Sequence, residues 1–348
     1  MKILVRGTNW IGDAVMSIPA LRELRRVFPD DKITLHTRSW ADGIFQDASF
    51  IDEIVSYDKA KWRHHDILDN SKFLKADRYD LAVLLPNSFE SAITAFLAKI
   101  PRRIGYNKDA RGLLLTDPVA VPEWKDRRHE AYYYLNLVQN VERLVLGRET
   151  VGRFEYSGLL EVSETRRLSA RQFLTENGAD LSRPTVALGV GSANSRAKRW
   201  PVENYASLAE LLSNHAHQNV ILVGSNEEVM AANEVEARSR FKLLNLAGKT
   251  DLAMAAAILA ESDLMISNDM GLAHLAPAVG TKTIVLFGPT NPETTRPFAP
   301  NAFVIREPVD CSPCMLRDCP IDHRCMTRIT PDHVFEVAFA EKGGDPDE

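Results

Sequence analysis

The sequence predicts an α/β protein with two doubly wound parallel sheets, one in each half of the chain. Short runs rich in β-branched residues alternate with longer segments of helical period, which is typical of parallel sheets covered by helices on both faces. This pattern occurs twice, and each time it opens with a strand that runs into a glycine-containing loop. The length of 348 residues suits two domains of ordinary size.

Four strands are expected in each half. They are residues 2–6, 33–37, 53–57 and 81–85, and then residues 186–190, 220–223, 264–267 and 283–287. Between the halves, residues 163–177 are predicted to form a helix that Ser163 caps and Gly178 ends. We therefore expect an N-terminal domain over residues 1–160, a connecting segment over 161–182, a C-terminal domain over 183–330 and a final helix or tail over 331–348.

The composition excludes several classes of protein. Apolar residues make up 45% of the chain and charged residues 26%, as in soluble globular proteins. The net charge of −5 gives no global basic field, so we expect no nucleic-acid partner. The apolar runs are too short to span a bilayer, and Arg6 interrupts what would be the core of a signal peptide. A cytoplasmic protein is expected.

The first loop of the second half resembles a phosphate site. Residues 189–201 combine small residues and hydroxyls with three cations directly before a predicted helix that has Pro201 in its first turn. The candidate ligands are Ser192, Asn194, Ser195 and Lys198. The loop lacks the Gly-Lys-Ser/Thr of a Walker A motif and the Gly-x-Gly-x-x-Gly dinucleotide fingerprint. A solvated basic loop is the alternative interpretation.

A second loop follows the strand predicted at residues 264–267. Its Asp269-Met270-Gly271-x-x-His274 sequence opens a helix, whose free N–H groups suit a diphosphate. Asp269 alone could be a helix cap, and His274 alone a packed core residue. Because both loops follow strands of one sheet, a shared anionic ligand is the favoured interpretation.

Acidic residues in two further loops are candidates for function. Glu227 or Glu228, after the strand at 220–223, could accept hydrogen bonds from ribose hydroxyls, or could simply complement the dipole of the next helix. Asp13 stands at the start of a helix in the first half, between apolar neighbours, where the helix dipole favours its ionised form. It could act as a base or merely cap the helix.

Three separated motifs carry a resemblance to a known family. The segments are residues 9–21, residues 197–201 and residues 267–274, and residues 85–91 and 100–106 extend the match along nearly the whole chain. Together they resemble the ADP-heptose:lipopolysaccharide heptosyltransferases of glycosyltransferase family 9, with most similarity to the heptosyltransferase II type.

The resemblance implies a GT-B fold, in which two Rossmann-like domains face a central cleft. It implies an inverting transfer of heptose from ADP-heptose to a lipid A–Kdo–heptose acceptor, without a catalytic cofactor. Asp13 would be the general base, Lys198 a catalytic phosphate ligand, and Asp269, Gly271 and His274 contacts to diphosphate and sugar. Met270 stands where relatives often have Ser or Thr, so only its backbone N–H could serve.

The resemblance leaves the acceptor side open. A monomer attached peripherally to the cytoplasmic face of the inner membrane is expected. Basic candidates for the anionic acceptor are Arg102, Arg103, Lys125, Arg127 and Arg128. Transfer of the first or third heptose, a nucleotide-sugar epimerase, a dinucleotide oxidoreductase and a non-catalytic nucleotide-binding scaffold are the alternatives.

All four cysteines fall in one segment with the spacing Cys311-x2-Cys314-x4-Cys319-x5-Cys325. In a reducing compartment they could hold a structural zinc ion or an iron–sulfur cluster. The spacing matches neither a zinc ribbon nor a ferredoxin run. Redox-labile disulfides and free thiols are the alternatives, and any metal would brace the loop.

Overall fold

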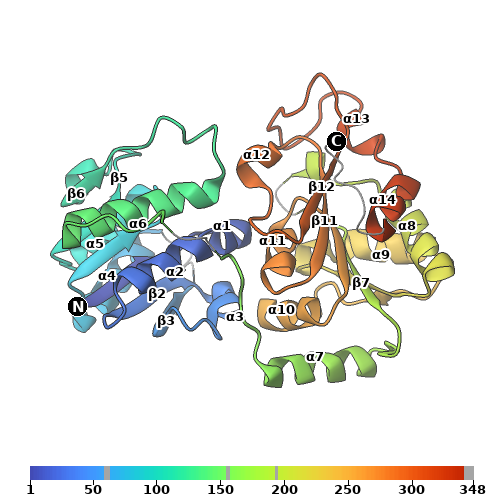
Figure 1. Cartoon of the computed structure of the whole chain (residues 1–348), viewed down its shortest axis with the longest axis horizontal. Coiled ribbons are helices and arrows are strands. Elements are labelled where there is room, and N and C mark those ends of the chain that lie inside the picture. The colour runs from blue at the N-terminus through green and yellow to red at the C-terminus, as the bar shows by residue number, and fades with distance from the viewer. Residues whose placement is uncertain (59–62, 154–156, 193–194, 341–348) are drawn as a thin grey trace. The chain divides into compact units, whose positions relative to one another are not determined.

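The computed structural model of the chain contains two α/β units, Met1–Glu161 and Val162–Glu348 (Figure 1). It describes residues 1–58, 63–153, 157–192 and 195–340. Each unit is built around one six-stranded sheet, and every strand pair in both sheets is parallel. The predicted α/β fold with two doubly wound sheets is confirmed.

The sheet of the first unit has the strand order β3-β2-β1-β4-β5-β6. Its strands are β1 Lys2–Arg6, β2 Lys32–Arg38, β3 Glu53–Tyr57, β4 Leu81–Leu84, β5 Arg102–Tyr106 and β6 Asp117–Val119. Its helices are α1 Ile11–Met16, α2 Ile18–Val27, α3 Asp42–Phe45, α4 Arg63–Asp77, α5 Phe89–Leu97 and α6 Glu130–Leu146. The order reverses between β1 and β4, so the loops after these two strands lie at the switch point, where ligands bind in such sheets.

Both faces of the first sheet are covered. Leu4, Ala82 and Leu84 pack with residues of α4 and α5 in one core cluster. Ile3 and Val83 alternate with them along the strands, point to the opposite face and are fully buried as well. Burial on both faces explains the continuous apolar runs of β1 and β4.

The second unit repeats this topology in the order β12-β11-β10-β7-β8-β9. Its strands are β7 Thr185–Gly189, β8 Asn219–Val223, β9 Leu244–Asn245, β10 Leu264–Asn268, β11 Lys282–Phe287 and β12 Ala302–Arg306. Its helices are α7 Glu164–Glu176, α8 Val202–His215, α9 Val229–Arg238, α10 Leu252–Ala260, α11 Gly271–Ala278, α12 Pro292–Thr295, α13 Arg324–Thr327 and α14 Pro331–Phe339. Here the switch point falls between β7 and β10.

All eight predicted strands are present, with ends that differ by one residue at most. Four strands were missed: β5, β6, β9 and β12. Strands β6, β9 and β12 are the outer or short members of their sheets, and β6 contains Pro118, which is tolerated at an edge. Strand β5 begins with Arg102 and Arg103, which resemble a solvated charge run more than a strand.

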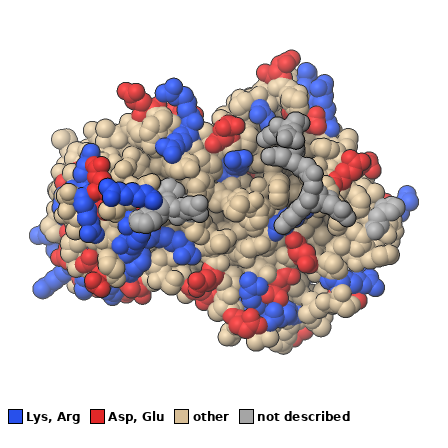
Figure 2. Space-filling model, viewed as in Figure 1, with Lys and Arg blue, Asp and Glu red and all other residues tan. Residues whose placement is uncertain are grey.

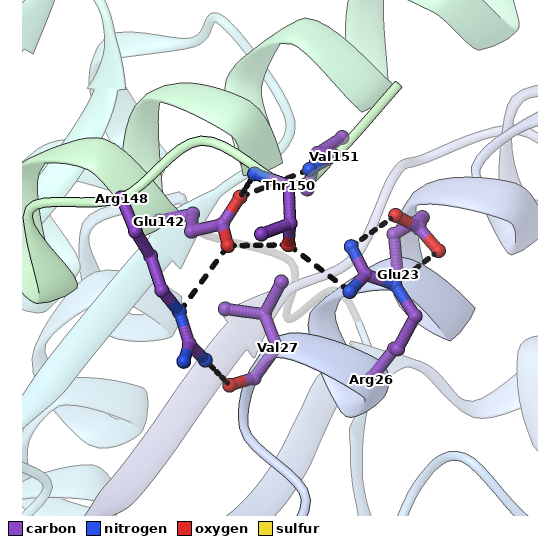
Figure 3. A network of polar contacts seen from close by, with 7 residues as sticks. All are labelled: Glu23, Arg26, Val27, Glu142, Arg148, Thr150 and Val151. Carbon is purple, nitrogen blue, oxygen red and sulfur yellow. Dashed lines mark hydrogen bonds and ion pairs between the residues drawn. The ribbon is translucent and has the colours of Figure 1, made fainter. Parts of the chain in front are cut away.

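A buried carboxylate fastens the end of α6 to the chain that follows it (Figure 3). Glu142 is fully buried and accepts hydrogen bonds from Thr150 N at 2.6 Å, Thr150 Oγ1 at 2.6 Å and Val151 N at 3.0 Å. Arg26 of α2 donates to Thr150 Oγ1 at 3.0 Å. Arg148 pairs with Glu142 at 3.4 Å. The network therefore joins α2 and α6 through the turn after α6.

The surface carries both signs of charge. On the face drawn in Figure 2, lysine and arginine side chains lie among aspartate and glutamate side chains. None of the helices in the described residues has the length and apolar character needed to cross a membrane.

Candidate nucleotide-sugar site

The loop after β7 holds most of the predicted phosphate ligands. It leads from Gly189 to a 3-10 turn, Arg196–Lys198, and α8 begins after Pro201 rather than at it. Ser192 and Ser195 are buried. The Ser192 carbonyl accepts a hydrogen bond from Arg199 at 3.0 Å, and Ser195 Oγ donates to the Arg317 carbonyl at 3.1 Å. Asn194 lies outside the described residues.

Lys198 meets the loop after β10. Its Nζ lies 2.7 Å from Asp269 Oδ2, and Thr290 Oγ1 donates to the same oxygen at 2.7 Å. The second carboxylate oxygen lies 3.9 Å from His274 Nε2. The Asp269 side chain is 6% exposed, whereas Lys198 keeps 26% of its side chain exposed. The Asp269 carboxylate is therefore buried, and Lys198 is the member of this ion pair whose side chain is partly exposed to solvent.

Asn268 fixes the two loops against each other. Its Nδ2 donates to the carbonyls of Val190 at 3.2 Å and Gly191 at 3.0 Å, and its Oδ1 accepts from Trp200 N at 3.0 Å. Asn268 ends β10, which pairs directly with β7. One fully buried amide thus satisfies backbone groups at both ends of the loop after β7, and nothing in the sequence indicates this role.

The start of α11 presents backbone donors beside this cluster. Met270 is the N-cap residue, with extended backbone, and the helix runs over Gly271–Ala278. The first N–H groups of a helix have no partner within it and favour an anion. The Met270 side chain packs against Val285 and Phe287 in a core cluster. A methionine at this position therefore adds packing in place of a hydroxyl donor.

Glu228, rather than Glu227, is enclosed by the site. Glu227 is exposed and Glu228 is 5% exposed. Glu228 Oε2 accepts from Ser225 N at 2.7 Å, which forms a capping box with the Ser225 side chain. A Cβ atom on Gly191 would lie 2.3 Å from Glu228 Cγ, so glycine is required for this close approach. Burial raises the pKa of Glu228, against the hydrogen bonds from Ser225.

The segment that contains the four cysteines contacts the Arg196–Lys198 turn of the loop after β7. His323 Nε2 lies 2.6 Å from the Ala197 carbonyl, and Ala197 N donates to the Arg317 carbonyl at 2.9 Å. Arg196 Nε donates to Asp318 at 2.6 Å. The segment is therefore a brace for the Arg196–Lys198 turn.

The tentative metal site at the cysteines is not supported. Cys311 and Cys314 are exposed, Cys319 is partly buried, Cys325 is buried in the core beneath, and all four are free thiols. Among the residues the structure describes, no three cysteine, histidine or acidic side chains are arranged to hold a metal ion. The four thiols therefore differ in exposure, and the brace is made by backbone carbonyls, His323 and Asp318.

Asp13 occupies the switch point of the first sheet. It lies in the first turn of α1, which follows the loop after β1, and its side chain is partly buried. Its charge acts on the buried Tyr134 of α6, whose pKa is raised chiefly by burial. Asp13 therefore lies where ligands bind in sheets of this topology.

Within each unit, the structure therefore brings candidate residues to the carboxyl edge of the sheet. In the second unit these include Lys198, Asp269, His274 and Glu228. Thr290, which follows β11, was missed because its contact with Asp269 spans 21 residues along the chain. The architecture is that of a two-domain α/β protein with charged side chains and helix N–H donors at the carboxyl edge of its second sheet.

Comparisons with known proteins specify this class. The family model for glycosyltransferase family 9 (heptosyltransferase) matches residues 67–324. Lipooligosaccharide heptosyltransferase 2 of Haemophilus ducreyi is 30% identical over 97% of this chain and 98% of its own length. Lipopolysaccharide heptosyltransferase 2 of Salmonella typhimurium is 31% identical over 97% of each. The solved structure of ADP-heptose lps heptosyltransferase II from E. coli superposes with a TM-score of 0.81 at 28% identity, covering 97% of both chains.

The chain therefore belongs to glycosyltransferase family 9, the heptosyltransferases. It is an enzyme of the glycosyltransferase class with the fold of heptosyltransferase II. The resemblance drawn from the three sequence motifs is confirmed.

Proposed function

We propose that this enzyme transfers heptose from ADP-heptose to the heptose/Kdo inner core of lipopolysaccharide, as a transferase of the heptosyltransferase II type. The observation that carries the proposal is the meeting of Lys198 with the Asp269 loop at the switch point of the second sheet. A lysine ammonium group and the N–H groups of α11 are suited to a diphosphate.

The proposed reaction is an inverting substitution. Asp13 takes the proton of the acceptor hydroxyl while that oxygen bonds to the anomeric carbon of the donor sugar. The bond from the anomeric carbon to the diphosphate breaks, and ADP leaves with the electron pair. Lys198 and the α11 N–H groups stabilise the charge that develops on the departing diphosphate.

Asp269 has a positioning role in this proposal. A carboxylate next to a diphosphate would repel it, but Asp269 is paired with Lys198, Thr290 and His274 and points its charge at them. It therefore holds the lysine in place before the donor binds, so that less side-chain entropy is lost on binding. Glu228 is proposed to accept hydrogen bonds from the ribose with its remaining oxygen.

We further propose that the enzyme acts as a monomer at the cytoplasmic face of the inner membrane. An apolar and basic surface of the first unit supports a peripheral contact. Leu113 is 98% exposed, and the nearby Arg103 donates to the Leu114 carbonyl and stacks over Phe96, which is itself 45% exposed. Such residues bind weakly to anionic lipid surfaces. Leu113→Ser should reduce co-sedimentation with anionic vesicles, whereas Leu159→Ser, another exposed leucine, should not.

The acceptor step is tested by ADP release with three acceptors that carry zero, one or two heptoses. Turnover with the one-heptose acceptor supports the heptosyltransferase II type. Preference for the acceptor with none or with two would instead assign the first or third heptose. Absence of ADP release with all three would contradict the proposal.

A further inference from the structure

Two buried arginines stand at the carboxyl edge of the first sheet. Arg6 ends β1 and Arg38 ends β2, and they are 5% and 7% exposed. Arg6 pairs in register with His36, and Arg38 with Tyr57. Because side chains alternate along strands, all four side chains lie on one face of the sheet. Among residues 1–58, 63–153, 157–192 and 195–340, neither Arg6 nor Arg38 forms an ion pair with an acidic side chain.

The Tyr57 ring holds the two guanidinium groups. Arg6 Cζ lies 4.4 Å and Arg38 Cζ 4.6 Å from the ring centroid, and the His36 ring lies 4.7 Å away. Arg6 Nη1 also donates to the His36 carbonyl at 3.2 Å. Cation–π contacts stabilise and orient the guanidinium groups but leave their charge in place.

Acidic residues compensate part of this charge. Burial lowers the pKa of Arg6 to about 9, the charge of Glu90 opposes this shift, and Arg38 adds to it. Burial also lowers the pKa of Arg38. The pKa of His36 falls to about 3, through burial and the charge of Arg6, so its ring is neutral. The acidic groups that act on Arg38 are Glu90, Asp66 and Asp58.

Polar atoms without hydrogen-bond partners accompany the arginines. In the described part of the chain, the Tyr57 hydroxyl, His36 Nδ1 and Thr8 Oγ1 are buried and unpaired. Thr8 is 5% exposed and stands two residues beyond Arg6, in the loop that leads to Asp13. Buried polar groups are costly unless they find a partner, and the hydroxyl groups of Tyr57 and Thr8 can donate hydrogen bonds. Together with the two cations, these hydroxyls indicate a site for a ligand oxygen.

We propose that Arg6 and Arg38, held by Tyr57, bind an acidic group of the sugar acceptor, either a carboxylate or a phosphate. The planar guanidinium fork matches the paired oxygens of both groups. This proposal rests on the proposed function, because the acid would bind at the carboxyl edge of the first sheet, and Asp13 follows β1 at the same edge. It identifies residues for acceptor recognition that differ from the five basic candidates chosen from sequence.

The test separates acceptor recognition from catalysis. In Arg38→Gln and Arg6→Gln, the acceptor KM should rise roughly 10- to 100-fold, the loss expected for a charge-assisted hydrogen bond. The kcat and the ADP affinity measured by calorimetry should stay unchanged. Lys32→Gln, at the opposite end of β2, is the matched control and should change nothing. An unchanged acceptor KM in folded Arg38→Gln overturns the proposal. If Arg6→Gln fails to fold, the acceptor KM values of Arg38→Gln and Tyr57→Phe test the proposal instead.

The chemical source of the acid is distinguished by two acceptor glycans. One keeps its carboxylates and has no phosphate, and the other keeps its phosphate and has its carboxylates reduced to alcohols. Calorimetry should show that one of the two binds the wild type more tightly than Arg38→Gln, and equal affinities for both proteins with both glycans would contradict the site. If such binding is seen without any heptose transfer, the proposed function fails and the anion site stands. If Arg38→Gln transfers heptose normally and keeps a normal acceptor KM, the anion site fails and the proposed function stands.

Discussion

The Lys198 ammonium group and the Asp269 carboxylate lie 2.7 Å apart, although 71 positions separate them in the numbering. Asp269 is also held by Thr290 at 2.7 Å. In the proposed donor site, Lys198 is therefore a cation whose position is fixed by a buried anion. A diphosphate that binds Lys198 therefore meets a group already directed by the fold, as electrostatic preorganisation requires.

Replacement of Lys198 tests the phosphate role. Lys198→Ala should weaken ADP binding roughly 10- to 100-fold and slow transfer as well, because the ammonium group contacts phosphate in both ground and transition states. Calorimetry with ADP measures the first effect. Lys249→Ala, which removes an exposed lysine of the same unit, is the control. Unchanged ADP affinity in Lys198→Ala would show that the phosphate role is wrong.

Replacement of Asp13 tests the base. Asp13→Asn keeps the shape of the side chain but removes its ability to accept a proton, so turnover should fall by roughly 10² to 10⁴ while ADP affinity is retained. Asp42→Asn is the matched control, because Asp42 also lies in the first turn of a helix of the first unit. Near-normal turnover of Asp13→Asn in a steady-state assay would remove Asp13 from the mechanism.

The ribose contact of Glu228 can be isolated with a nucleotide analogue. ADP should bind the wild type more tightly than an ADP analogue without ribose hydroxyls, by roughly tenfold or more. Glu228→Gln should lose most of this discrimination and keep the capping geometry of Ser225. Glu227→Gln should behave as the wild type, since Glu227 is exposed. Equal discrimination by all three proteins would leave Glu228 with only its capping role.

Glu142 should make the stability of the first unit depend on pH. Burial alone would raise the pKa of Glu142, but hydrogen bonds from Thr150 and Val151 and the charge of Arg26 outweigh burial and lower it from 4.5. A lowered pKa adds stability that is present above about pH 4.5 and is lost as the pH falls through the folded-state pKa.

The comparison of Glu142→Gln with the wild type measures this effect. Chemical unfolding at pH 7 should show the variant less stable by about 1 to 3 kcal/mol, because one buried partner of several donors is replaced. The difference should shrink as the pH falls below about 4.5 and through the lowered pKa of Glu142. Glu149→Gln, at an exposed position nearby, should have little effect at either pH. A difference that does not change with pH would contradict an ionised Glu142.

The four thiols should react at very different rates. Cys311 and Cys314 are exposed and should be the first of the four to be alkylated at neutral pH. Cys325 is buried, and burial together with the charges of the other three cysteines raises its pKa, so little reactive thiolate forms. Mass spectrometry of time-quenched samples follows each site, and labelling in denaturant should reach all four. Rapid alkylation of native Cys325 would contradict this packing.

Local sequence patterns determined the strands that are buried on both faces. Each central strand is a short apolar run in the sequence, because helices cover both faces of the sheet there. These strands are β1, β4, β7 and β10. The same runs located the loops that carry Asp13, Lys198 and Asp269, since each loop directly follows such a strand. The sequence also predicted the ends of α7, because Ser163 and Gly178 are residue types that commonly begin and end helices.

Only the tertiary structure decided which of these residues meet. The order of the strands puts β7 beside β10, and this neighbourhood brings Lys198 to Asp269 and Asn268 to Gly191. Burial, which depends on packing between distant segments, separated Glu228 from Glu227.

The dependence on contacts between distant segments also explains one wrong prediction and one feature that the sequence did not predict. Cysteine spacing suggested one metal site, but Cys325 is drawn into the core while Cys311 stays at the surface. Nothing in the sequence grouped Arg6 with Arg38, but the strand register places both guanidinium groups over the Tyr57 ring. Periodicity records contacts between residues a few positions apart, whereas a site depends on strand order and on the burial that follows from it.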